Sequence, residues 1–211
     1  MTGQDGRVWF ITGCSSGFGR ALVDAARVRG DRVVATARRP DGLAGLQGDD
    51  VFVLQLDVTH EEALEPALTA ATDRFGRIDV LVNNAGIGLA GALEEMRIDE
   101  LCAAMETMFF GPTALTRPVL PRMRAQGSGT IVQISSQGGR MAGPGVSAYC
   151  AAKFALAQTL SRVYGRSTRS SARSSCAGSR SHARRHSRPN AVRQPNATGR
   201  SAARAAVHGK R

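Results

Sequence analysis

Long hydrophobic runs are missing from the sequence: none approaches the roughly 20 residues that a membrane-spanning helix needs. The first seven residues show no basic segment leading into an apolar one, so we expect no secretory signal and a cytoplasmic protein that does not engage a membrane. The four cysteines form no Cys-x-x-Cys pair, and His60 is the only histidine in residues 1–165. We therefore expect reduced thiols and no metal site.

Acidic residues are missing from one part of the chain. Residues 166–211 contain 12 Lys and Arg and no Asp or Glu, whereas residues 1–165 hold 16 basic and 17 acidic residues. The net charge of +11 thus belongs to the C-terminal segment. That segment also lacks Leu, Ile, Phe, Met, Trp and Tyr, so it cannot bury enough apolar surface to offset its ordering entropy. We predict a folded domain over residues 1–164 and a disordered Arg/Ser-rich tail over 165–211.

The composition of the tail changes abruptly inside a predicted helix. Its Arg, Ser, Ala and Gly residues are typical of GC-rich codons read out of phase, so we hypothesise that the tail derives from a frameshift, which resequencing of the gene would test. Uncompensated cations also predict salt-dependent, sequence-independent binding to nucleic acid or another polyanion. The tail lacks aromatic residues for base stacking, so any such binding is expected to be nonspecific.

Short apolar runs alternate with longer amphipathic ones in residues 1–165. The predicted strands are Arg7–Ile11, Arg32–Thr36, Val51–Leu56, Ile78–Val82 and Thr130–Ile134. The predicted helices are Gly19–Arg29, Glu61–Phe75, a long one from about Ile98 to Arg124, and a last one from near Ser147. Val, Ile and Leu fill the strands with little polar alternation, as expected where both faces of a sheet are covered. This order predicts an α/β fold with right-handed strand–helix–strand units and a parallel sheet.

A glycine-rich turn follows the first predicted strand. It reads Thr12-Gly13-Cys14-Ser15-Ser16-Gly17-Phe18-Gly19, and a helix comes next. Glycines allow a tight turn and the close approach of a pyrophosphate, while the helix N-terminus offers free N–H groups and the positive end of its dipole. The hydroxyls of Ser15 and Ser16 can contact phosphate or ribose. The alternative is an ordinary Gly/Ser loop, but its place in a strand–helix–strand unit favours dinucleotide binding.

Four further motifs follow the turn in order. They are Asp57-Val58, Asn83-Asn84-Ala85-Gly86, Ile134-Ser135-Ser136 and Tyr149-x-x-x-Lys153. Together with the turn they resemble the short-chain dehydrogenase/reductase family, over about residues 6–164. The resemblance implies a three-layer, doubly wound Rossmann-type sheet and an oxidoreductase that transfers a hydride between NAD(P)(H) and an alcohol or ketone. Members of the family are usually homo-oligomers.

The resemblance assigns catalytic roles to three residues. Tyr149 and Lys153 are four apart on a predicted helix and therefore share one face. A phenol of ordinary pKa, about 10, is a weak base at neutral pH, and a nearby ammonium group favours its ionised form. Tyr149 would thus act as the acid/base, Lys153 would tune it and bind the nicotinamide ribose, and Ser136 would orient the substrate oxygen. The alternative for Tyr149 and Lys153 is a surface pair on an amphipathic helix.

The remaining motifs concern the cofactor. Ala37 stands where the family often has an acid for the adenosine ribose, and Arg38 offers a guanidinium to a 2′-phosphate, which favours NADP(H) over NAD(H). The alternative is that Arg38 belongs to a solvated charged loop. By analogy Asp57, beside Val58, accepts from the adenine amino group. Thr59 is predicted to cap the next helix in a capping box, which leaves Asp57 free.

The stretch Asn84, Ala85 and Gly86 resembles the family's segment beneath the cofactor ribose, although it is also a good turn sequence. Cys14 and Cys150 flank the predicted site, and we interpret both as small packing residues because no thiol–base pair is evident.

The chain departs from the family in two places. Met108 stands where the family has a catalytic asparagine, and a thioether cannot replace its amide. After about residue 164 the tail replaces the family's last strands and the rest of the helix that forms dimers, which would leave the fifth strand as an open edge. Activity is therefore expected to be impaired. The alternative function is a nonenzymatic remnant of a nucleotide-binding fold whose basic tail binds nucleic acid or other polyanions.

Overall fold

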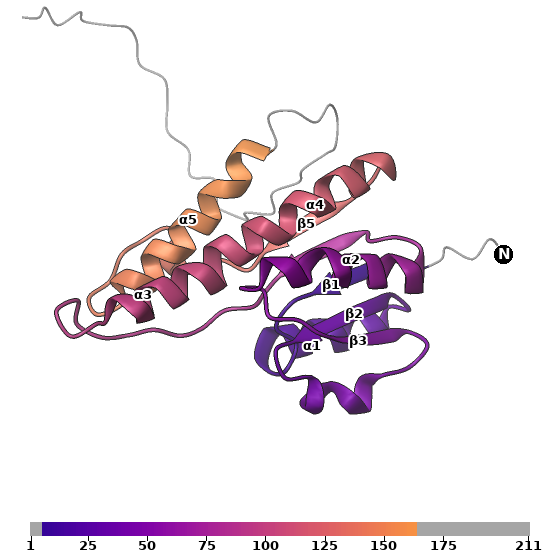
Figure 1. The fold of residues 1–211 in the computed structure, drawn as a ribbon, viewed down its shortest axis with the longest axis horizontal. Helices are drawn as coiled ribbons and strands as arrows, with labels where there is room; N and C mark the ends of the chain where they lie inside the picture. The colour runs from indigo at the N-terminus through magenta and orange to yellow at the C-terminus, as the bar shows by residue number, and fades with distance from the viewer. Residues whose placement is uncertain (1–5, 164–211) are drawn as a thin grey trace, which may run out of the picture. The chain divides into compact units, whose positions relative to one another are not determined.

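The structure is a computed structural model that describes residues 6–163 (Figure 1). Its elements are β1 (Val8–Ile11), α1 (Gly17–Val28), β2 (Arg32–Ala37), the 3₁₀ segment η1 (Pro40–Leu46), β3 (Val51–Gln55), α2 (Glu61–Phe75), β4 (Val80–Asn83), α3 (Ile98–Met105), the π-helix η2 (Glu106–Phe110), α4 (Gly111–Ala125), β5 (Thr130–Gln133), the 3₁₀ turn η3 (Gln137–Gly139) and α5 (Ser147–Val163). Strand and helix alternate along this part of the chain, as the sequence predicts. The predicted tail, residues 165–211, lies outside the described residues.

The five strands form one parallel sheet in the order β3-β2-β1-β4-β5. The chain moves outward from β1 to β3 and then crosses back, so that β4 lies on the other side of β1. Ile11 of β1 lies opposite Val82 of β4, which brings the loops after these two strands together. In sheets of this kind ligands bind where the strand order reverses, outside the carboxyl ends of the strands. The topology therefore fixes where a site is to be sought.

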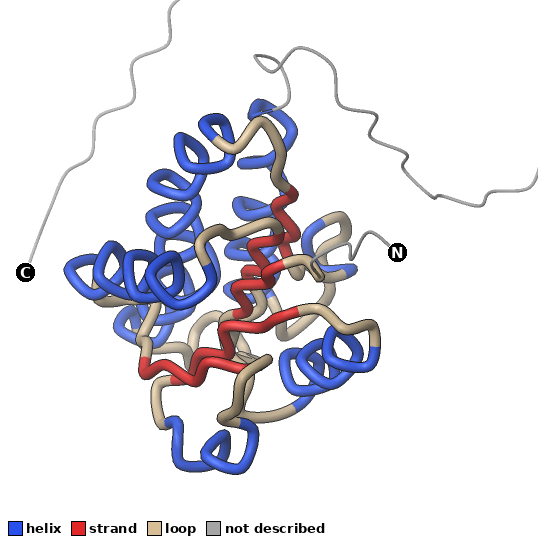
Figure 2. Tube along the Cα trace, turned by 90° about the vertical axis from the view of Figure 1, so that its right-hand side faces the viewer, coloured by secondary structure: helices blue, strands red, loops and turns tan. Residues whose placement is uncertain are grey.

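Helices cover the sheet from both sides, as Figure 2 shows in a view along it. On one side α2 and α4 bury Leu68 and Leu115 against Phe10 and Leu81 of the central strands. On the other side α1 and η1 pack against a second group of strand residues that includes Val33 and Val82. Alternate residues of each strand thus enter opposite cores, which explains the almost unbroken apolar runs in the sequence. The predicted three-layer α/β fold is confirmed.

The long helix predicted from Ile98 to Arg124 is wrong in detail. The chain is helical there, but α3 and α4 are joined by η2, in which Gly111 N–H bonds to Glu106 O, five residues back. Pro112 gives a physical reason, because proline has no N–H for the fourth carbonyl before it and its ring collides with that carbonyl in a regular α-helix. The wider turn of η2 removes this conflict, and α4 continues from Gly111.

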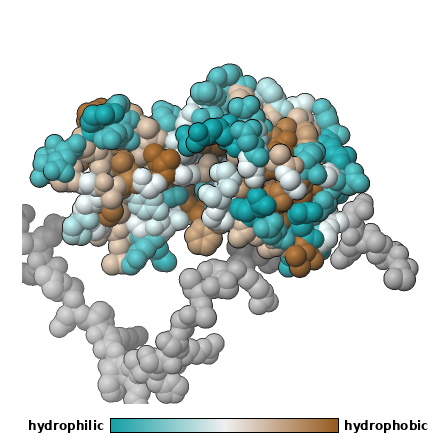
Figure 3. Space-filling view, turned by 90° about the horizontal axis from the view of Figure 1, so that it is seen from below, coloured by the Kyte–Doolittle hydropathy of each residue, from teal (hydrophilic) through white to brown (hydrophobic). Residues whose placement is uncertain are grey.

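Strand β5 pairs with β4 alone among the residues described, so it is the edge of the described sheet. On the α1 side, Val132 of β5 and Ile134, the first residue after it, are partly buried. Large exposed hydrophobic side chains elsewhere are scattered, and on the face seen in Figure 3 hydrophobic residues form separate patches among hydrophilic ones. Within residues 6–163, no helix has the length and apolar character needed to cross a membrane.

Candidate functional site

The glycine-rich turn between β1 and α1 forms one wall of the site. Gly13 has a φ of +70° and Gly17 a φ of +57°, a region that favours glycine. A Cβ at Gly13 would lie 2.8 Å from Cα of Ala85, whereas one at Gly17 would meet nothing within 4 Å. Gly13 is thus required for close packing, and Gly17 leaves open space above the N-terminus of α1. This is the arrangement that a pyrophosphate needs at a helix N-terminus.

Thr12 ties this turn to the loop after β4. Its hydroxyl oxygen lies 3.0 Å from the backbone N atoms of both Asn84 and Ala85, which donate to it, and 3.4 Å from the carbonyl of Val82, to which it donates. The amide of Asn84 donates in return to the carbonyls of Thr12 and Gly13, at 2.8 and 2.9 Å. This role of Thr12 was not predicted from the sequence. Its position immediately before the first glycine of the turn was the one feature that could have indicated it.

At the other end of the site, Asp57 was predicted to be free of hydrogen bonds within the chain, and the structure shows that it is not. Its Oδ1 accepts hydrogen bonds from the Thr59 backbone N–H at 3.0 Å and from the Thr59 hydroxyl at 2.8 Å. The predicted capping box is therefore wrong: His60 is the N-cap residue of α2 and makes no side-chain cap bond. An aspartate two residues before a threonine forms this local turn readily, and it competes with capping. The residue still lines the cavity, and its Oδ2 makes no hydrogen bond to the part of the chain that the structure describes.

The charge of Asp57 follows from these contacts. Burial acts to raise its pKa, but the two hydrogen bonds from Thr59 and the nearby charge of Arg38 outweigh burial and hold the pKa below its ordinary value. The carboxylate is therefore ionised at neutral pH and acts as an acceptor only. The position of Arg38 is set by the side chain of Gln55, whose amide donates to the Arg38 carbonyl at 3.1 Å.

Lys153 brings α5 to the carboxyl end of the sheet. Its side chain is only 5% exposed, and Nζ donates to the carbonyl of Ile134, just after β5, at 2.8 Å. Burial lowers the pKa of this ammonium group below its ordinary value of 10.5. A Cβ at Gly86 would lie 3.6 Å from Nζ, so Lys153 approaches the backbone of the loop after β4, where Ala85 and Gly86 form the floor of the site.

Tyr149 and Ser136 meet at Gly138. Lys153 Nζ lies 5.9 Å from the centre of the Tyr149 ring, which confirms that the two residues share a helix face. A Cβ at Gly138 would lie 3.3 Å from Cδ1 and Cε1 of that ring, and the Gly138 N–H donates to Oγ of Ser136 at 3.2 Å. The η3 turn thus places the serine and the tyrosine on either side of one glycine. Its neighbour Gly139 is equally constrained, because a Cβ there would lie 2.9 Å from the Lys153 carbonyl.

A cavity of about 310 Å³ joins most of these elements. The predicted residues that line it are Gly13, Ser15, Ser16, Phe18, Arg38, Asp57, Val58, Asn84, Ala85 and Gly86. The residues that line it without having been predicted are Ala37, Arg39, Leu56, Ile87 and Thr107. Gly17, Gly19, Ser136, Tyr149 and Lys153 lie outside its lining. Gly19 acts through packing, since a Cβ there would lie 2.5 Å from Nδ2 of Asn84 and collide with the Gly13 carbonyl.

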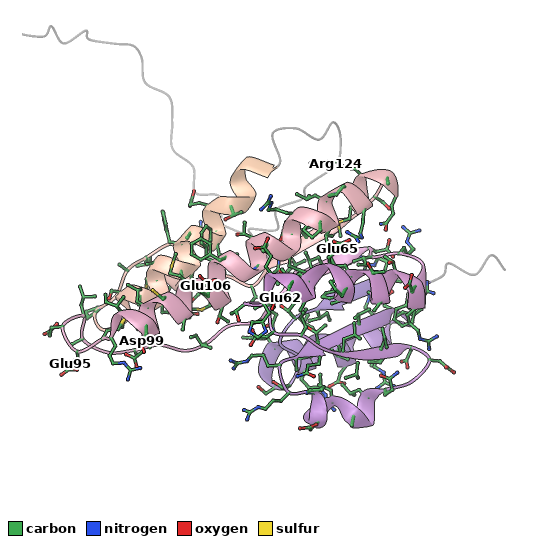
Figure 4. All side chains as sticks on the ribbon, in the orientation of Figure 1. Glu62, Glu65, Glu95, Asp99, Glu106 and Arg124 are labelled. Carbon is green, nitrogen blue, oxygen red and sulfur yellow. The ribbon has the colours of Figure 1, made fainter. Side chains whose placement is uncertain are left out.

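The charges around the cavity favour an anionic ligand. Many acidic side chains lie on α2 and in the segment from residue 94 to 106. Among them are Glu62, Glu65, Glu95, Asp99 and Glu106 (Figure 4). None of these lines the cavity, whose charged residues are Arg38, Arg39 and Asp57. Asp57 is therefore the single acidic residue in a lining that also holds two arginines and the glycine-rich turn.

Two cysteines flank the site and pack as predicted. Cys14 is fully buried and Cys150 is 7% exposed. Burial raises the pKa of the Cys14 thiol to about 12, so it stays protonated at neutral pH. Neither thiol has the environment of a reactive nucleophile.

A family model described as "short chain dehydrogenase" matches residues 7–169, about three quarters of the chain. The chain belongs to the short-chain dehydrogenase family. Among its relatives is "Oxidoreductase BOA17" of Botryotinia fuckeliana, which is 44% identical over 154 residues, covering 71% of this chain and 56% of that protein. The chain thus spans little more than half of that relative.

Solved structures agree with this membership. A short-chain dehydrogenase from Streptomyces avermitilis matches with a TM-score of 0.71 and 46% identity, over 75% of this chain and 59% of that one. A short-chain dehydrogenase/reductase from Burkholderia phymatum, solved in complex with NAD, matches with a TM-score of 0.72 and 29% identity, over 78% and 61% of the two chains. The Rossmann-type fold predicted from the sequence is therefore shown.

The structure shows what surrounds Met108, which stands where the short-chain dehydrogenase family has an asparagine. Met108 lies on η2, is fully buried, and packs with Ala104 and Ala152 near Ile87 and Tyr149. A Cβ at Gly86 would lie 3.7 Å from Cγ of Met108 and 3.6 Å from Nζ of Lys153. The apolar thioether of Met108 and the ammonium group of Lys153 thus both lie beside Gly86, on the floor of the site.

Proposed function

We propose that the chain binds a nicotinamide dinucleotide in the cavity and transfers a hydride between it and an alcohol or ketone, with Tyr149 as the acid/base. One observation carries the proposal: Lys153 Nζ reaches both the ring of Tyr149 and the floor at Gly86, which continues into the cavity. This contact connects the predicted proton-transfer group to the predicted cofactor site.

The residues present fit such a dinucleotide. The open space above Gly17 and the hydroxyls of Ser15 and Ser16 suit the diphosphate, while Arg38 and Asp57 lie at the end where an adenosine would bind. Ala85 and Gly86 form a floor without side chains large enough to fill the cavity. When bound, the nicotinamide would supply or accept the hydride.

The chain's own residues would manage the proton. In ketone reduction, the Tyr149 hydroxyl donates its proton to the carbonyl oxygen, and in alcohol oxidation the same oxygen receives it. Ser136, held on η3 by the Gly138 N–H, is placed to hydrogen-bond the same substrate oxygen. The Lys153 ammonium group adds a positive charge beside the phenol and can bond a ribose hydroxyl.

For the cofactor we propose NADP(H), with NAD(H) as the alternative. Arg38 and Arg39 both line the adenosine end of the cavity, and the last residue of β2, Ala37, is not an acid. A 2′-phosphate would gain charge-assisted hydrogen bonds from these guanidinium groups. The Burkholderia phymatum relative is solved in complex with NAD, which is why NAD(H) is kept as the alternative.

The test separates binding from turnover. Fluorescence titration of the full chain with NADPH and with NADH measures both dissociation constants, and the absorbance of reduced nicotinamide then follows turnover with a panel of ketones. We expect saturable binding that is tighter for NADPH, and a loss of this preference in Arg38→Ala. A chain that binds neither dinucleotide would overturn the proposal, and tighter binding of NADH would overturn the cofactor assignment alone.

A second candidate function is nonspecific binding of nucleic acid or another polyanion. It is favoured by the 12 basic residues and the absence of acids in residues 166–211. Retention on DNA that weakens steeply with salt, in a chain that shows no saturable dinucleotide binding, would support it over the first proposal.

A further inference from the structure

Thr107 is a cavity-lining residue that no sequence motif pointed to. It lies on η2, is half-buried, and shares the cavity with the glycine-rich turn and with Asn84, Ala85 and Gly86. Its hydroxyl makes no hydrogen bond to any residue in the described part of the chain. The oxygen therefore keeps its full capacity to donate and to accept.

The neighbouring threonines behave differently. The hydroxyl of Thr113 donates to the carbonyl of Phe109 at 2.7 Å, and that of Thr116 donates to the carbonyl of Pro112 at 2.7 Å. A hydroxyl inside a helix is ordinarily satisfied in this way, by the carbonyl four residues before it. Thr107 thus stands apart from the two threonines that follow it in the same helical stretch.

The π-helix explains why Thr107 reaches the cavity. Gly111, which closes the wide turn, packs so tightly that a Cβ there would lie 2.5 Å from the carbonyl of Val58. The helix therefore touches the loop after β3 at the point where its register changes. Short π-helical turns occur often at functional sites because they redirect single side chains. Thr107 is the only residue of η2 with a hydroxyl or amide side chain. The next residue, Met108, is fully buried and has no hydrogen to donate.

We propose that Thr107 is a further cofactor-binding residue, whose hydroxyl bonds an oxygen of the sugar–phosphate backbone of the dinucleotide. This rests on the proposed function. The sugar–phosphate backbone is the part of the ligand that fits, because Thr107 lines the same cavity as Ser15 and Ser16 of the phosphate-binding turn and as Ala85 and Gly86. Ribose hydroxyls and phosphate oxygens can both pair with a hydroxyl that donates and accepts.

Three variants of the full chain test the proposal by NADPH titration. Thr107→Val removes the hydroxyl and keeps the shape, Thr107→Ser keeps the hydroxyl, and Thr113→Val is the matched control in the same helical stretch. Loss of one neutral hydrogen bond to a ligand predicts NADPH binding weaker by roughly three- to tenfold in Thr107→Val. Thr107→Ser and Thr113→Val are expected to bind within about twofold of the wild type, a change too small to count as the loss of one such bond.

Titration with adenosine 2′,5′-bisphosphate locates the contact. If Thr107→Val weakens this fragment as well, the hydroxyl contacts the adenosine half, and if it weakens only NADPH, the contact is with the nicotinamide half. Unchanged NADPH binding in Thr107→Val would overturn the assignment while leaving the proposed function intact, as would equal weakening in Thr113→Val. A wild-type chain that binds no dinucleotide would overturn both.

Discussion

Lys153 is the residue on which the proposed chemistry turns. It is the only lysine in residues 1–165, is 5% exposed, and donates a hydrogen bond to the carbonyl of Ile134. Burying an ammonium group costs free energy, and arginine carries the other positive charges of this part of the chain, so we expect this lysine to have a specific role. Its position between the Tyr149 ring and Gly86 gives it one.

We predict that Lys153→Met abolishes turnover without weakening the fold. Burial lowers the pKa of Lys153, so the folded state holds the proton less tightly than the unfolded state, and stability rises as pH increases from the folded pKa towards 10.5. Removing the charge therefore removes the desolvation free energy that the folded state loses at neutral pH by burying this ammonium group. We expect a melting temperature equal to or above that of the wild type and kcat lower by roughly 100-fold or more. Calorimetry and ketone reduction measure the two effects, and a marked fall in melting temperature would show that Lys153 is a structural residue.

A second prediction concerns the buried thiol of Cys14. Its pKa is raised from 9.0 to about 12, so above pH 9 the unfolded chain loses this proton while the folded chain keeps it. The resulting stability is complete below pH 9 and is lost as pH rises through about 12, by up to about 1.4 kcal/mol per pH unit. Urea unfolding of the wild type and of Cys14→Ala from pH 8 upward, sampled at roughly half-unit steps, should show a shallower decline in the variant. Identical slopes would contradict the assigned environment of Cys14.

Residue roles were predictable where they depend on local spacing. Tyr149 and Lys153 share a face because they are four apart on a helix, and the structure places them as expected. The pairing of Asp57 with Thr59 was not predictable, because the threonine can bond either to the start of the helix or to the aspartate, and only the folded geometry decides. Thr107 could not be found from the sequence, since its exposure to the cavity depends on a π-helical turn.

At the scale of elements, the contact between the glycine-rich turn and the loop after β4 holds the site together. Gly19 stands at the centre of this contact, where a Cβ would collide with the Gly13 carbonyl and lie 2.5 Å from Nδ2 of Asn84. Backbone atoms cannot move aside cheaply, so the turn would have to open. The stability of α1 and the shape of the phosphate site are therefore coupled through this glycine.

We predict that Gly19→Ala lowers stability by about 1–3 kcal/mol and weakens NADPH binding by roughly tenfold or more. Gly42→Ala is the matched control, since a Cβ there meets nothing within 4 Å and Gly42 lies in η1, outside the cavity lining. Urea unfolding and NADPH titration measure both effects. If the two variants behaved alike, the close packing of α1 against the loop after β4 would not matter for the site.

The elements themselves were largely predictable. The five strands are runs of Val, Ile and Leu that enter both cores, and four helical regions were placed because their apolar residues recur at helical spacing. The interruption at η2 was missed because the amphipathic pattern continues through it. Its cause combines Pro112 with the packing of Gly111 on Val58, and the second of these is a contact between residues far apart in sequence.

At the scale of the whole molecule, the strand order determines where function can lie. Because β4 returns to the side of β1 opposite β2, the loops after β1 and β4 form one crevice. The end of β2, the loop after β3 and η2 also line it, and α5 approaches it through Lys153 beside Gly86. The order of the motifs along the chain predicted this assembly through the family resemblance. The predicted frameshift and the disordered tail fall on residues 165–211, outside the described part, and stay predictions.

The most direct test compares the full wild-type chain with Tyr149→Phe, which removes only the hydroxyl. NADPH titration and the oxidation of NADPH by a ketone are measured on both proteins. We predict equal NADPH affinity within about twofold, a difference smaller than one lost hydrogen bond would give, and a reduction rate at least roughly 100-fold lower in the variant. Equal rates in the two proteins would contradict a role for this phenol in proton transfer, and with it the proposed reaction.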